Sequence, residues 1–245
     1  MIIEAKNLTF RHPGADRDTL KELTFSVEEG ECLCLLGVNG SGKSTLLAVL
    51  AGLLAQAEGE LSVAGNELPR EAFKLRGKVA LVPQDPDVYI LGSLVEEDLF
   101  LGLDADDEEG RKRAVGFARL FDLGDQLQQP VHTLSYGQKR KLCLASALAS
   151  RPRILLLDEP FAGLDHPATM AMREALSRNK GAKLTQVVVG HDLDIMADLA
   201  DSFMLLKDGK ILAHGDSDDV FPRLSANGVR PPCWWYTHGK SPLWL

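Results

Sequence analysis

The chain has 245 residues, of which 45% are hydrophobic and 25% are charged, a composition typical of a globular protein. Its 27 Lys and Arg residues against 35 Asp and Glu residues give a net charge of −8, which disfavours binding to nucleic acid or to an anionic membrane surface. The longest run of Ile, Leu and Val, from Ile154 to Leu157, is far shorter than the roughly 20 residues of a membrane-spanning helix. These numbers indicate one compact domain, with a subdomain at most, that does not cross a bilayer.

Predicted strands and helices alternate along the chain. Apolar runs bounded by turn residues predict strands at residues 2–5, 23–27, 32–36, 79–82, 154–157, 187–189 and 203–206. A helix is predicted at 45–51 after a glycine-rich turn, and residues 93–150 have a mainly helical pattern with breaks near Gly110, Gly124 and Pro130. This order, with mixed β structure first and a helical insertion between two α/β parts, predicts an α/β fold.

Five acidic residues gather before one helical stretch. They are Asp104, Asp106, Asp107, Glu108 and Glu109. Such a cluster has the composition of a metal-binding patch, but acidic side chains at a helix start also interact favourably with the positive end of the helix dipole. We favour the helix-start interpretation.

The composition changes from about Pro222 to the end of the chain. This segment holds several prolines and all three tryptophans: Pro222, Pro231, Pro232, Pro242, Trp234, Trp235 and Trp244. Two interpretations stay open, a strap that docks on the rest of the protein and a loose end.

A glycine-rich segment directly follows the strand predicted at 32–36. Its sequence, Gly37-Val-Asn-Gly-Ser-Gly-Lys43-Ser44, fits the phosphate-loop pattern G-x-x-x-x-G-K-[ST] between a strand and a helix. Backbone N–H groups of such a loop surround phosphate oxygens, Lys43 can reach the β- and γ-phosphates, and the Ser44 hydroxyl can ligate Mg²⁺. The nucleotide-binding residues expected here are Gly37, Asn39, Gly40, Ser41, Gly42, Lys43, Ser44 and Thr45.

Two adjacent carboxylates end the strand predicted at 154–157. Successive side chains on a strand point in opposite directions, so Asp158 and Glu159 have different roles unless the backbone turns between them. In a P-loop NTPase the carboxylate at such a strand end holds Mg²⁺, which suits Asp158. Glu159, nearer the γ-phosphate, is then the candidate that polarises the attacking water. Without the phosphate loop, a solvated turn would be the simpler interpretation.

A third motif, Leu-Ser-Tyr-Gly-Gln at 134–138, precedes a cationic stretch at 139–141 and an apolar helical pattern that reaches Ala149. With this signature motif, the chain resembles the ATP-binding subunits of ABC transporters over about residues 1–220. Six motifs follow the family's order: the phosphate loop, Gln84, the signature motif, the carboxylate pair, Ala162-Gly-Leu-Asp165 and His191.

The resemblance implies a fold class and two cofactors. The expected fold is α/β, a P-loop NTPase (RecA-like) core with an N-terminal antiparallel β subdomain and an inserted α-helical subdomain at about 88–150. The ABC ATPase domain would cover residues 1–220 and the Pro/Trp-rich tail residues 221–245. ATP and Mg²⁺ are the expected cofactors.

The resemblance also implies roles for single residues. In this family two chains sandwich two ATP molecules, and the signature motif faces the γ-phosphate held by the other subunit, so Ser135 and Gly137 would act across a dimer interface from a helix N-terminus. Gln138 and Asp165 belong to the same expected ATP-binding set. The expected catalytic residues are Glu159, His191 and Gln84, and the expected Mg²⁺ ligands are Ser44, Gln84 and Asp158.

The chain departs from the family pattern at two positions. The family usually has glycine where this chain has Tyr136, so a competent site with altered packing is expected. The family also places an aromatic ring, commonly tyrosine, against adenine. The aligned residue here is His12, with Phe10 as the alternative, and either ring can stack on a base.

Three functional interpretations are open to a chain with this phosphate loop. They are the motor subunit of a membrane importer, a soluble ABC-type protein of translation or DNA repair, and an unrelated P-loop enzyme such as a GTPase or small-molecule kinase. The guanine-reading pattern Asn-Lys-x-Asp is not matched, because the nearest segment is Asn179-Lys-Gly-Ala182. Soluble ABC-type proteins usually carry two cassettes or long insertions, whereas the span from Gln84 to Ser135 leaves room only for a small helical subdomain. The importer subunit is the preferred interpretation.

Two segments resemble energy-coupling-factor importers, which take up cobalt, nickel or vitamins such as biotin. They are Gln84-Asp-Pro-Asp87 and residues 95–102, and the signature form Leu-Ser-Tyr-Gly-Gln-Lys is most similar to the cobalt and nickel members. The expected function is therefore ATP hydrolysis that powers cobalt or nickel import. An importer of a biotin-type vitamin or another small solute is the alternative, and a soluble non-transport ABC protein is the third choice.

The expected partners are proteins. Because the cassette begins at Met1 without a secretory signal, separate integral membrane transporter subunits are expected, with this chain as a peripheral subunit at the cytoplasmic face of the cell membrane. A second ATPase subunit, in a homodimer or a heterodimer, is expected as well, and nucleic acid is not.

Overall fold

Four N-terminal strands form an antiparallel sheet. The computed structural model describes residues 1–104 and 106–237. The sheet has the order β2-β1-β4-β5, built from β1 (Ile3–Phe10), β2 (Leu20–Val27), β4 (Glu58–Val63) and β5 (Asn66–Leu68). All neighbouring pairs in it are antiparallel.

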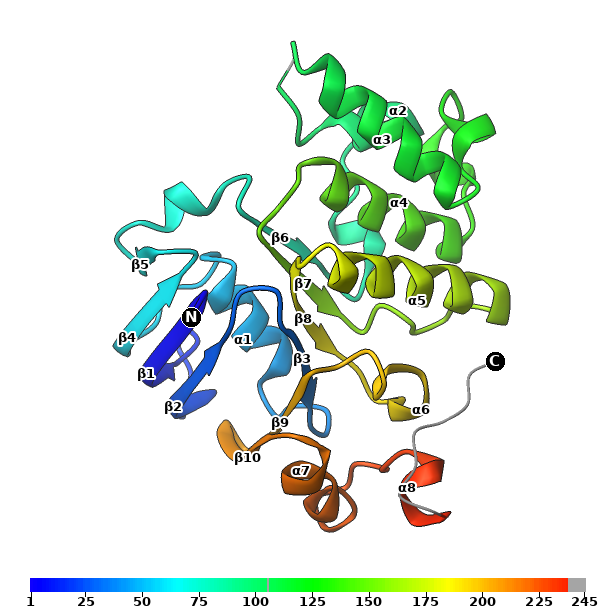
Figure 1. Cartoon of the computed structure of the whole chain (residues 1–245). Coiled ribbons are helices and arrows are strands. Elements are labelled where there is room, and N and C mark those ends of the chain that lie inside the picture. The colour runs from blue at the N-terminus through cyan, green and yellow to red at the C-terminus, as the bar shows by residue number, and fades with distance from the viewer. Residues whose placement is uncertain (105, 238–245) are drawn as a thin grey trace.

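A second, six-stranded sheet lies at the centre of the molecule (Figure 1). Its order is β10-β9-β3-β8-β7-β6, with β3 (Cys32–Leu36), β6 (Val79–Val82), β7 (Ile154–Asp158), β8 (Thr185–Val189), β9 (Ser202–Lys207) and β10 (Lys210–Gly215). The pairs from β6 to β9 are parallel, and only β10 is antiparallel to its neighbour. The carboxyl ends of five strands therefore meet at one edge of the sheet, where α/β proteins bind ligands.

Helices cover both faces of this sheet, which explains why its strands read as continuous apolar runs. They are α1 (Lys43–Leu50), α2 (Val95–Phe100), α3 (Glu108–Leu120), α4 (Tyr136–Ala149), α5 (His166–Gly181), α6 (Leu193–Met196), α7 (Ser217–Leu224) and α8 (Cys233–Thr237). Short 3-10 turns occur at Ala72–Leu75, Pro86–Val88, Gly124–Gln126, Val131–Thr133 and Ser225–Asn227. Among the described residues, no helix is both long and apolar enough to span a bilayer.

Two hydrophobic clusters hold the layers together. On β3, Cys32, Cys34 and Leu36 face the cluster that contains α4 and α5, whereas Leu33 and Leu35 face the cluster that contains α1 and the antiparallel sheet. Helix α1 thus lies between the two sheets, and α2, α3 and α4 form the separate helical part that enters the chain between β6 and β7 (Figure 1). This arrangement confirms the predicted α/β class with an antiparallel β part and inserted helices.

The structure corrects the predicted helix break near Gly110. Gly110 is buried in the first turn of α3, because the Asp107 side chain caps the helix by accepting the Gly110 N–H at 2.7 Å. The break lies before Asp107 instead. Glu108 and Glu109 occupy the first turn, which confirms the helix-start interpretation of the acidic residues. Within residues 1–104 and 106–237, no group of three or more His, Cys, Asp or Glu side chains is placed to hold a metal ion.

The C-terminal segment docks on the main body as far as the structure describes it. Trp234 and Trp235 lie with ring centroids 6.0 Å and 5.2 Å from Phe221, and the Cys233 N–H donates to Asp194 at 2.6 Å. These contacts contradict the loose-end interpretation up to Trp235. The boundary expected at 220/221 falls inside α7, where Phe221 is buried in the main cluster. Residues 238–245, with Pro242 and Trp244, lie outside the described residues.

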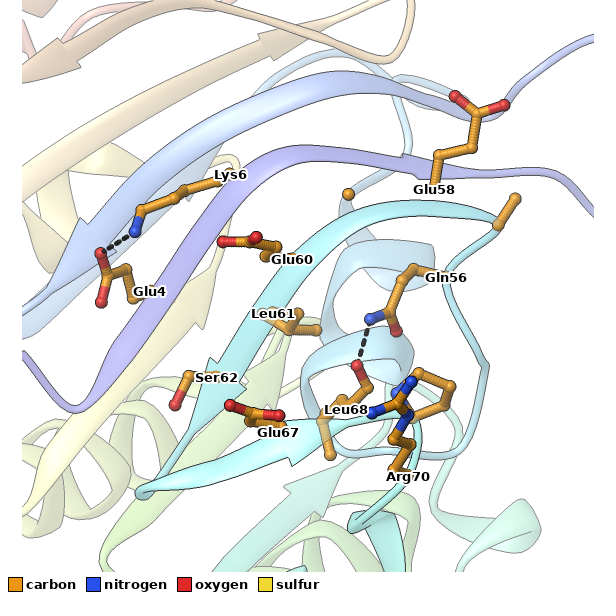
Figure 2. A pocket seen from close by; sticks show the side chains of 13 residues that line it. Glu4, Lys6, Gln56, Glu58, Glu60, Leu61, Ser62, Glu67, Leu68 and Arg70 are labelled. Carbon is orange, nitrogen blue, oxygen red and sulfur yellow. Dashed lines mark hydrogen bonds and ion pairs between the residues drawn. The ribbon is translucent and has the colours of Figure 1, made fainter.

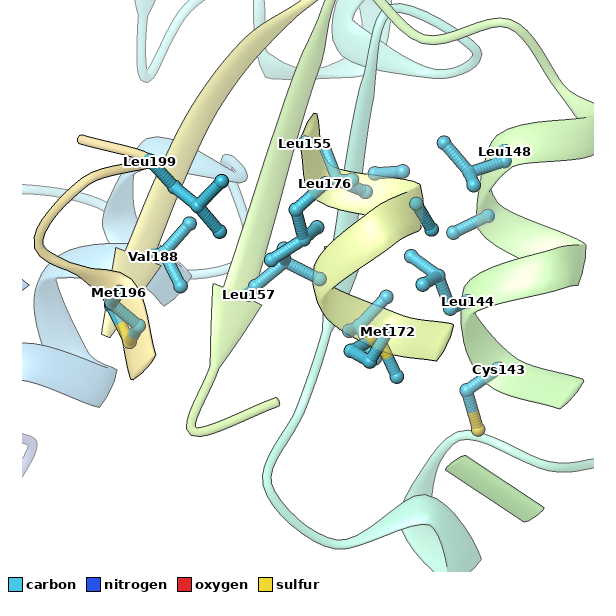
Figure 3. Packing of buried hydrophobic residues seen from close by; sticks show 14 of the residues in the cluster. Cys143, Leu144, Leu148, Leu155, Leu157, Met172, Leu176, Val188, Met196 and Leu199 are labelled. Carbon is cyan, nitrogen blue, oxygen red and sulfur yellow. The ribbon is translucent and has the colours of Figure 1, made fainter. Parts of the chain in front are cut away.

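Leu155 lies at the centre of the packing between β7 and the helices α4 and α5 (Figure 3). Because this side chain is fully buried, Leu155→Ala is expected to lower the free energy of unfolding by about 2–5 kcal/mol through lost burial and the cavity left behind. Urea unfolding monitored by circular dichroism measures the change. The matched control is Leu53→Ala at an exposed position, where we expect a change within about 0.5 kcal/mol. Equal effects of the two substitutions would contradict the assignment of Leu155 to the core.

Candidate functional site

The glycine loop between β3 and α1 has a conformation that other residues cannot adopt. Gly37 has φ of 149°, and a Cβ there would lie 2.2 Å from the Leu206 carbonyl oxygen of β9. Gly42 has φ of 107° and stands immediately before α1, so the loop delivers its backbone N–H groups to a helix N-terminus. The Ser41 hydroxyl oxygen is buried in this loop without a hydrogen-bond partner. An orphaned buried hydroxyl inside such a cradle fits a phosphate group as its ligand.

Lys43 lies at the centre of the loop and is buried. Its Nζ donates to the Gly37 carbonyl oxygen at 2.7 Å and to the Val38 carbonyl oxygen at 3.0 Å. Burial lowers the pKa of Lys43, and the nearby carboxylates of Glu159 and Asp158 oppose this shift. The backbone carbonyl groups of the loop therefore hold the Lys43 ammonium group in a fixed place beside the N-terminus of α1, where a triphosphate requires a cation.

Asp158 and Ser44 lie next to each other at the end of β7 and the start of α1. Burial raises the pKa of Asp158, and a hydrogen bond from the Ser44 side chain opposes the rise. A carboxylate beside a hydroxyl at the mouth of a phosphate loop is the oxygen donor set that suits Mg²⁺. Glu159 follows with φ of 48°, so the backbone does turn after Asp158 and directs the second carboxylate elsewhere.

The Glu159 carboxylate is held by two side chains from neighbouring strand ends. His191 Nε2 lies 2.7 Å from Oε1, and Gln84 Nε2 donates to Oε2 at 3.1 Å. Gln84, Glu159 and His191 follow the adjacent strands β6, β7 and β8. They line one cavity of about 390 Å³ together with the phosphate loop, the remaining lining residues being Thr19, Asn39, Gly40, Gly42, Lys43, Ser44 and Thr45. The topology thus brings together residues that lie far apart in the sequence.

The two candidate adenine-stacking residues differ in exposure. Phe10 is buried in the core and meets the His12 ring edge-on at 4.8 Å, so its face is not open to a base. His12 is exposed, and its Nε2 lies 3.5 Å from the Thr45 hydroxyl at the start of α1. Of the two rings, only His12 is open to solvent beside the phosphate loop.

The signature residues do not line this cavity. The Ser135 hydroxyl caps α4 by accepting a hydrogen bond from the Gln138 backbone N–H at 3.3 Å. The Gln138 side-chain oxygen in turn accepts a hydrogen bond from the Ser135 backbone N–H at 2.8 Å. Asp165 caps α5 in the same way, by accepting the Ala168 N–H at 2.9 Å. Within one chain, Ser135, Gly137, Gln138 and Asp165 therefore remain apart from the phosphate loop.

Two residues near the site are not identified by sequence reasoning. Thr19 lines the cavity from the start of β2, and no motif marks it. Arg140 appears in the sequence only as part of a cationic stretch, but it is buried and donates to the backbone of both Gln84 and Glu159. The signal that could have indicated Arg140 is its helical spacing of four residues from Tyr136.

A larger cavity lies elsewhere, on the antiparallel sheet (Figure 2). This groove of about 840 Å³ is lined by exposed carboxylates such as Glu58 and Glu60, and the exposed Lys6 pairs with Glu4 at 3.1 Å. No residue of the phosphate loop or of the strand ends of the central sheet lines it. We therefore place the chemistry at the smaller cavity.

A phosphate loop that feeds a helix, a buried lysine within it and carboxylates at the end of a parallel strand define a P-loop NTPase. The sequence model of the ABC transporter family matches residues 20–162. The chain belongs to this family and is an ATPase, as the motif order predicted.

Relatives of known type align over nearly the whole chain. The cobalt import ATP-binding protein CbiO of Rhodobacter capsulatus is 37% identical over 240 residues, which are 94% of this chain and 85% of the relative. The energy-coupling factor transporter ATP-binding protein EcfA of Carboxydothermus hydrogenoformans is 34% identical over 238 residues, 95% of this chain and 88% of the relative.

Solved structures share the architecture. The cbiO1 protein of Clostridium perfringens, part of the ABC transporter complex cbiONQ, superposes with a TM-score of 0.76 at 28% identity and covers 90% of each chain. A dimeric ATP-binding cassette in a post-hydrolysis state, bound to ADP and Pi, superposes with a TM-score of 0.77 at 28% identity, over 87% of this chain and 98% of that one. These likenesses confirm the predicted P-loop NTPase fold.

Proposed function

We propose that this chain is the ATP-hydrolysing subunit of an energy-coupling-factor importer that carries cobalt or nickel ions. The observation that supports the hydrolytic part best is the convergence of Gln84, Glu159 and His191 beside Lys43 in one cavity. The likeness to CbiO and EcfA proteins supports the transporter class. Since the EcfA relative is 34% identical, only slightly below the 37% of the CbiO relative, an importer of a biotin-type vitamin or another small solute is the alternative.

The residues of the cavity divide the chemistry among them. Lys43 and the loop N–H groups bind the β- and γ-phosphates, and Ser44, Asp158 and Gln84 are the proposed Mg²⁺ ligands. Bound Mg²⁺ would neutralise charge on the phosphate oxygens. Glu159 accepts the proton of the attacking water, while His191 and Gln84 orient its carboxylate through their contacts with its two oxygens.

A second ATPase subunit completes the site in this proposal. Ser135 and Gly137 stand at the N-terminus of α4, away from the cavity of their own chain, with N–H groups suited to an anion. Such donors reach a γ-phosphate only when it is held by another subunit. Because one chain carries Lys43, Asp158 and Glu159 as well, a homodimer would have two competent sites, and a heterodimer with a related cassette satisfies the same geometry.

A surface beside Gln84 suits the membrane subunits. A groove of about 420 Å³ runs between the Gln84 segment and the inserted helices, lined by Asp87, Gly92, Ser93, Leu94, Pro130, Val131, His132 and Lys139. Beside it Val88 and Leu91 are 73% and 77% exposed, although both are aliphatic. Exposed apolar side chains next to a catalytic loop indicate a protein interface, and docking there would place the chain at the cytoplasmic face of the membrane.

The test is uptake by cells that lack their own cobalt and nickel transport and express this chain with the membrane subunits that co-purify with it. We expect uptake of radioactive cobalt or nickel, and no uptake of biotin. Val88→Asp combined with Leu91→Asp is expected to lower uptake at least 10-fold and to prevent co-purification with the membrane subunits, because two charges would be buried in the interface. Leu53→Asp, also at an exposed leucine, is the control and should retain uptake. Biotin uptake without metal uptake would reject the metal assignment, and normal co-purification of the double variant would reject the docking surface.

A further inference from the structure

Tyr136 and Arg140 project from the first turns of α4 toward the ends of β6 and β7. Ser135 caps the helix, so Tyr136 begins it, and Arg140, four residues later, lies on the same face. The Tyr136 hydroxyl donates to the Gln84 carbonyl oxygen at 3.1 Å. The Arg140 guanidinium carbon lies 5.2 Å from the centre of the Tyr136 ring, within the range of a cation–π contact. The two side chains therefore form one stacked and hydrogen-bonded unit.

Arg140 connects this unit to two strand ends. It is only 2% exposed, and one guanidinium nitrogen donates to the Glu159 carbonyl oxygen at 2.6 Å. Its other terminal nitrogen donates to the Gln84 carbonyl oxygen and to the Tyr136 hydroxyl. A buried cation needs such partners, and hydrogen bonds from a charged donor are stronger than those between neutral groups. The start of α4 is thus fixed to the backbone of both catalytic candidates.

The positions of these two carbonyl groups determine where two side chains meet. Val82 of β6 is paired with Leu157 of β7, so Gln84 and Glu159 each lie two residues beyond a paired position. Their side chains touch at 3.1 Å, from Gln84 Nε2 to Glu159 Oε2. Each carbonyl group fixes the peptide plane next to its own side chain. Hydrogen bonds to both carbonyl groups therefore restrict how the Gln84 amide and the Glu159 carboxylate are oriented relative to each other.

The Tyr136 ring also contacts the segment that follows Glu159. A Cβ on Gly163 would lie 3.1 Å from ring atom Cε1, which is tighter than ordinary contact, and Gly163 has φ of 73°. The ring is 44% exposed, so it covers this turn from the solvent side. Tyr136 thus touches the segments after β6 and after β7 at once.

We propose that Tyr136 and Arg140, with the carbonyl groups of Gln84 and Glu159, form a latch that makes Tyr136 a positioning residue for ATP hydrolysis. The latch makes the alignment of Gln84 and Glu159 depend on the position of α4. The latch requires the tyrosine, because the glycine usual at this position of the signature motif has neither ring nor hydroxyl. Its role rests on the proposed assignment of Gln84 and Glu159 to hydrolysis.

Tyr136→Phe tests the latch because it keeps the ring over Arg140 and removes only the hydroxyl. We expect kcat for ATP hydrolysis to fall about 3- to 10-fold, the effect of one hydrogen bond, with KM for ATP within about twofold of the wild-type value. The matched control is Thr133→Val, which removes a hydroxyl that donates to the Pro130 carbonyl oxygen at 2.7 Å without touching Gln84 or Glu159. Its kcat should stay within about twofold of wild type.

Hydrogen exchange gives a readout that does not depend on activity. In the Tyr136→Phe protein we expect the amides of residues 84–90 to exchange several times faster than in wild type, while those of α5 are unchanged. Tyr136→Phe combined with Arg140→Lys should lower kcat by less than the product of the two single effects, since both act on the same Gln84 carbonyl.

The outcomes separate the latch from the proposed hydrolytic residues when Glu159→Gln is assayed beside these variants. The latch alone is overturned if Glu159→Gln loses turnover while Tyr136→Phe keeps the wild-type kcat and the wild-type rates of hydrogen exchange. Full turnover in Glu159→Gln overturns the hydrolytic assignment and the role of the latch with it. A rise in KM that accounts for the whole effect of Tyr136→Phe also overturns the positioning role.

Discussion

Replacing Glu159 by glutamine is expected to reduce steady-state ATP turnover by about 100-fold or more, the range that loss of a general base produces. Glutamine has nearly the same shape and can keep hydrogen bonds to Gln84 and His191, but it does not accept the proton of the attacking water. ATP binding should persist, because Lys43 and the phosphate loop are untouched. The variant should therefore accumulate as an ATP-bound dimer.

Two measurements check this expectation. A coupled phosphate-release assay gives the turnover, and size-exclusion chromatography with and without ATP and Mg²⁺ shows whether a dimer accumulates. The control is Glu174→Gln, the same change on the exposed face of α5, where Glu174 pairs with Arg178 at 2.6 Å and turnover should be unchanged. Undiminished hydrolysis by Glu159→Gln would contradict the assignment of Glu159 as the general base.

Lys43→Ala is expected to abolish the stabilisation of the protein by ATP and Mg²⁺. A ligand present at about 100 times its Kd stabilises the native state by about 2.7 kcal/mol, which raises the Tm of a protein of this size by about 5–10 °C. Without the Lys43 ammonium, no cation remains in the phosphate loop to pair with the β- and γ-phosphates. The Tm of the variant should be the same with and without the nucleotide.

Differential scanning fluorimetry over a series of ATP concentrations measures this difference within each variant, so an effect of the substitution on basal stability does not enter. Lys112→Ala is the control, because Lys112 is exposed on α3 and pairs with Glu109 away from the cavity, and it should show the full shift of wild type. A shift of wild-type size in Lys43→Ala would remove Lys43 from the phosphate site.

The sequence predicts β3 and β6 to the residue, because both are short apolar runs that end at a glycine or a proline. It fails where a single side chain outside the pattern decides the local structure. Gly110 looks like a helix break, but the Asp107 cap makes it part of the first turn of α3. Likewise the tail composition allows either a strap or a loose end, and the contacts of Trp234 and Trp235 with Phe221 and of Cys233 with Asp194 distinguish them.

For the candidate site, motif spacing identifies the residues but not their mutual contacts. The phosphate loop, Gln84, Glu159 and His191 can be named from the sequence because each follows a predicted strand. That both Gln84 and His191 bond one carboxylate depends on the order β6-β7-β8 in the sheet, which no local pattern encodes. The burial of Arg140 is equally non-local, since its partners lie 56 and 19 residues away in the chain.

The place of β6 at the edge of the six-stranded sheet gives the residues of the cavity unequal freedom. Glu159 follows β7, which is paired on both sides, and the phosphate loop follows β3, which is also paired on both sides. Gln84 follows a strand with one neighbouring strand, so its segment can separate from the sheet by breaking a single ladder of strand hydrogen bonds and the hydrogen bonds of Tyr136 and Arg140 to the Gln84 carbonyl oxygen. The groups proposed to hold the nucleotide and to accept the proton thus follow interior strands, whereas Gln84, beside the groove proposed for the membrane subunits, follows the edge strand. A displacement of β6 would withdraw one of the two side chains that contact the Glu159 carboxylate while Lys43 and the phosphate loop stay in place, and so we expect it to lower the rate of hydrolysis more than the affinity for ATP.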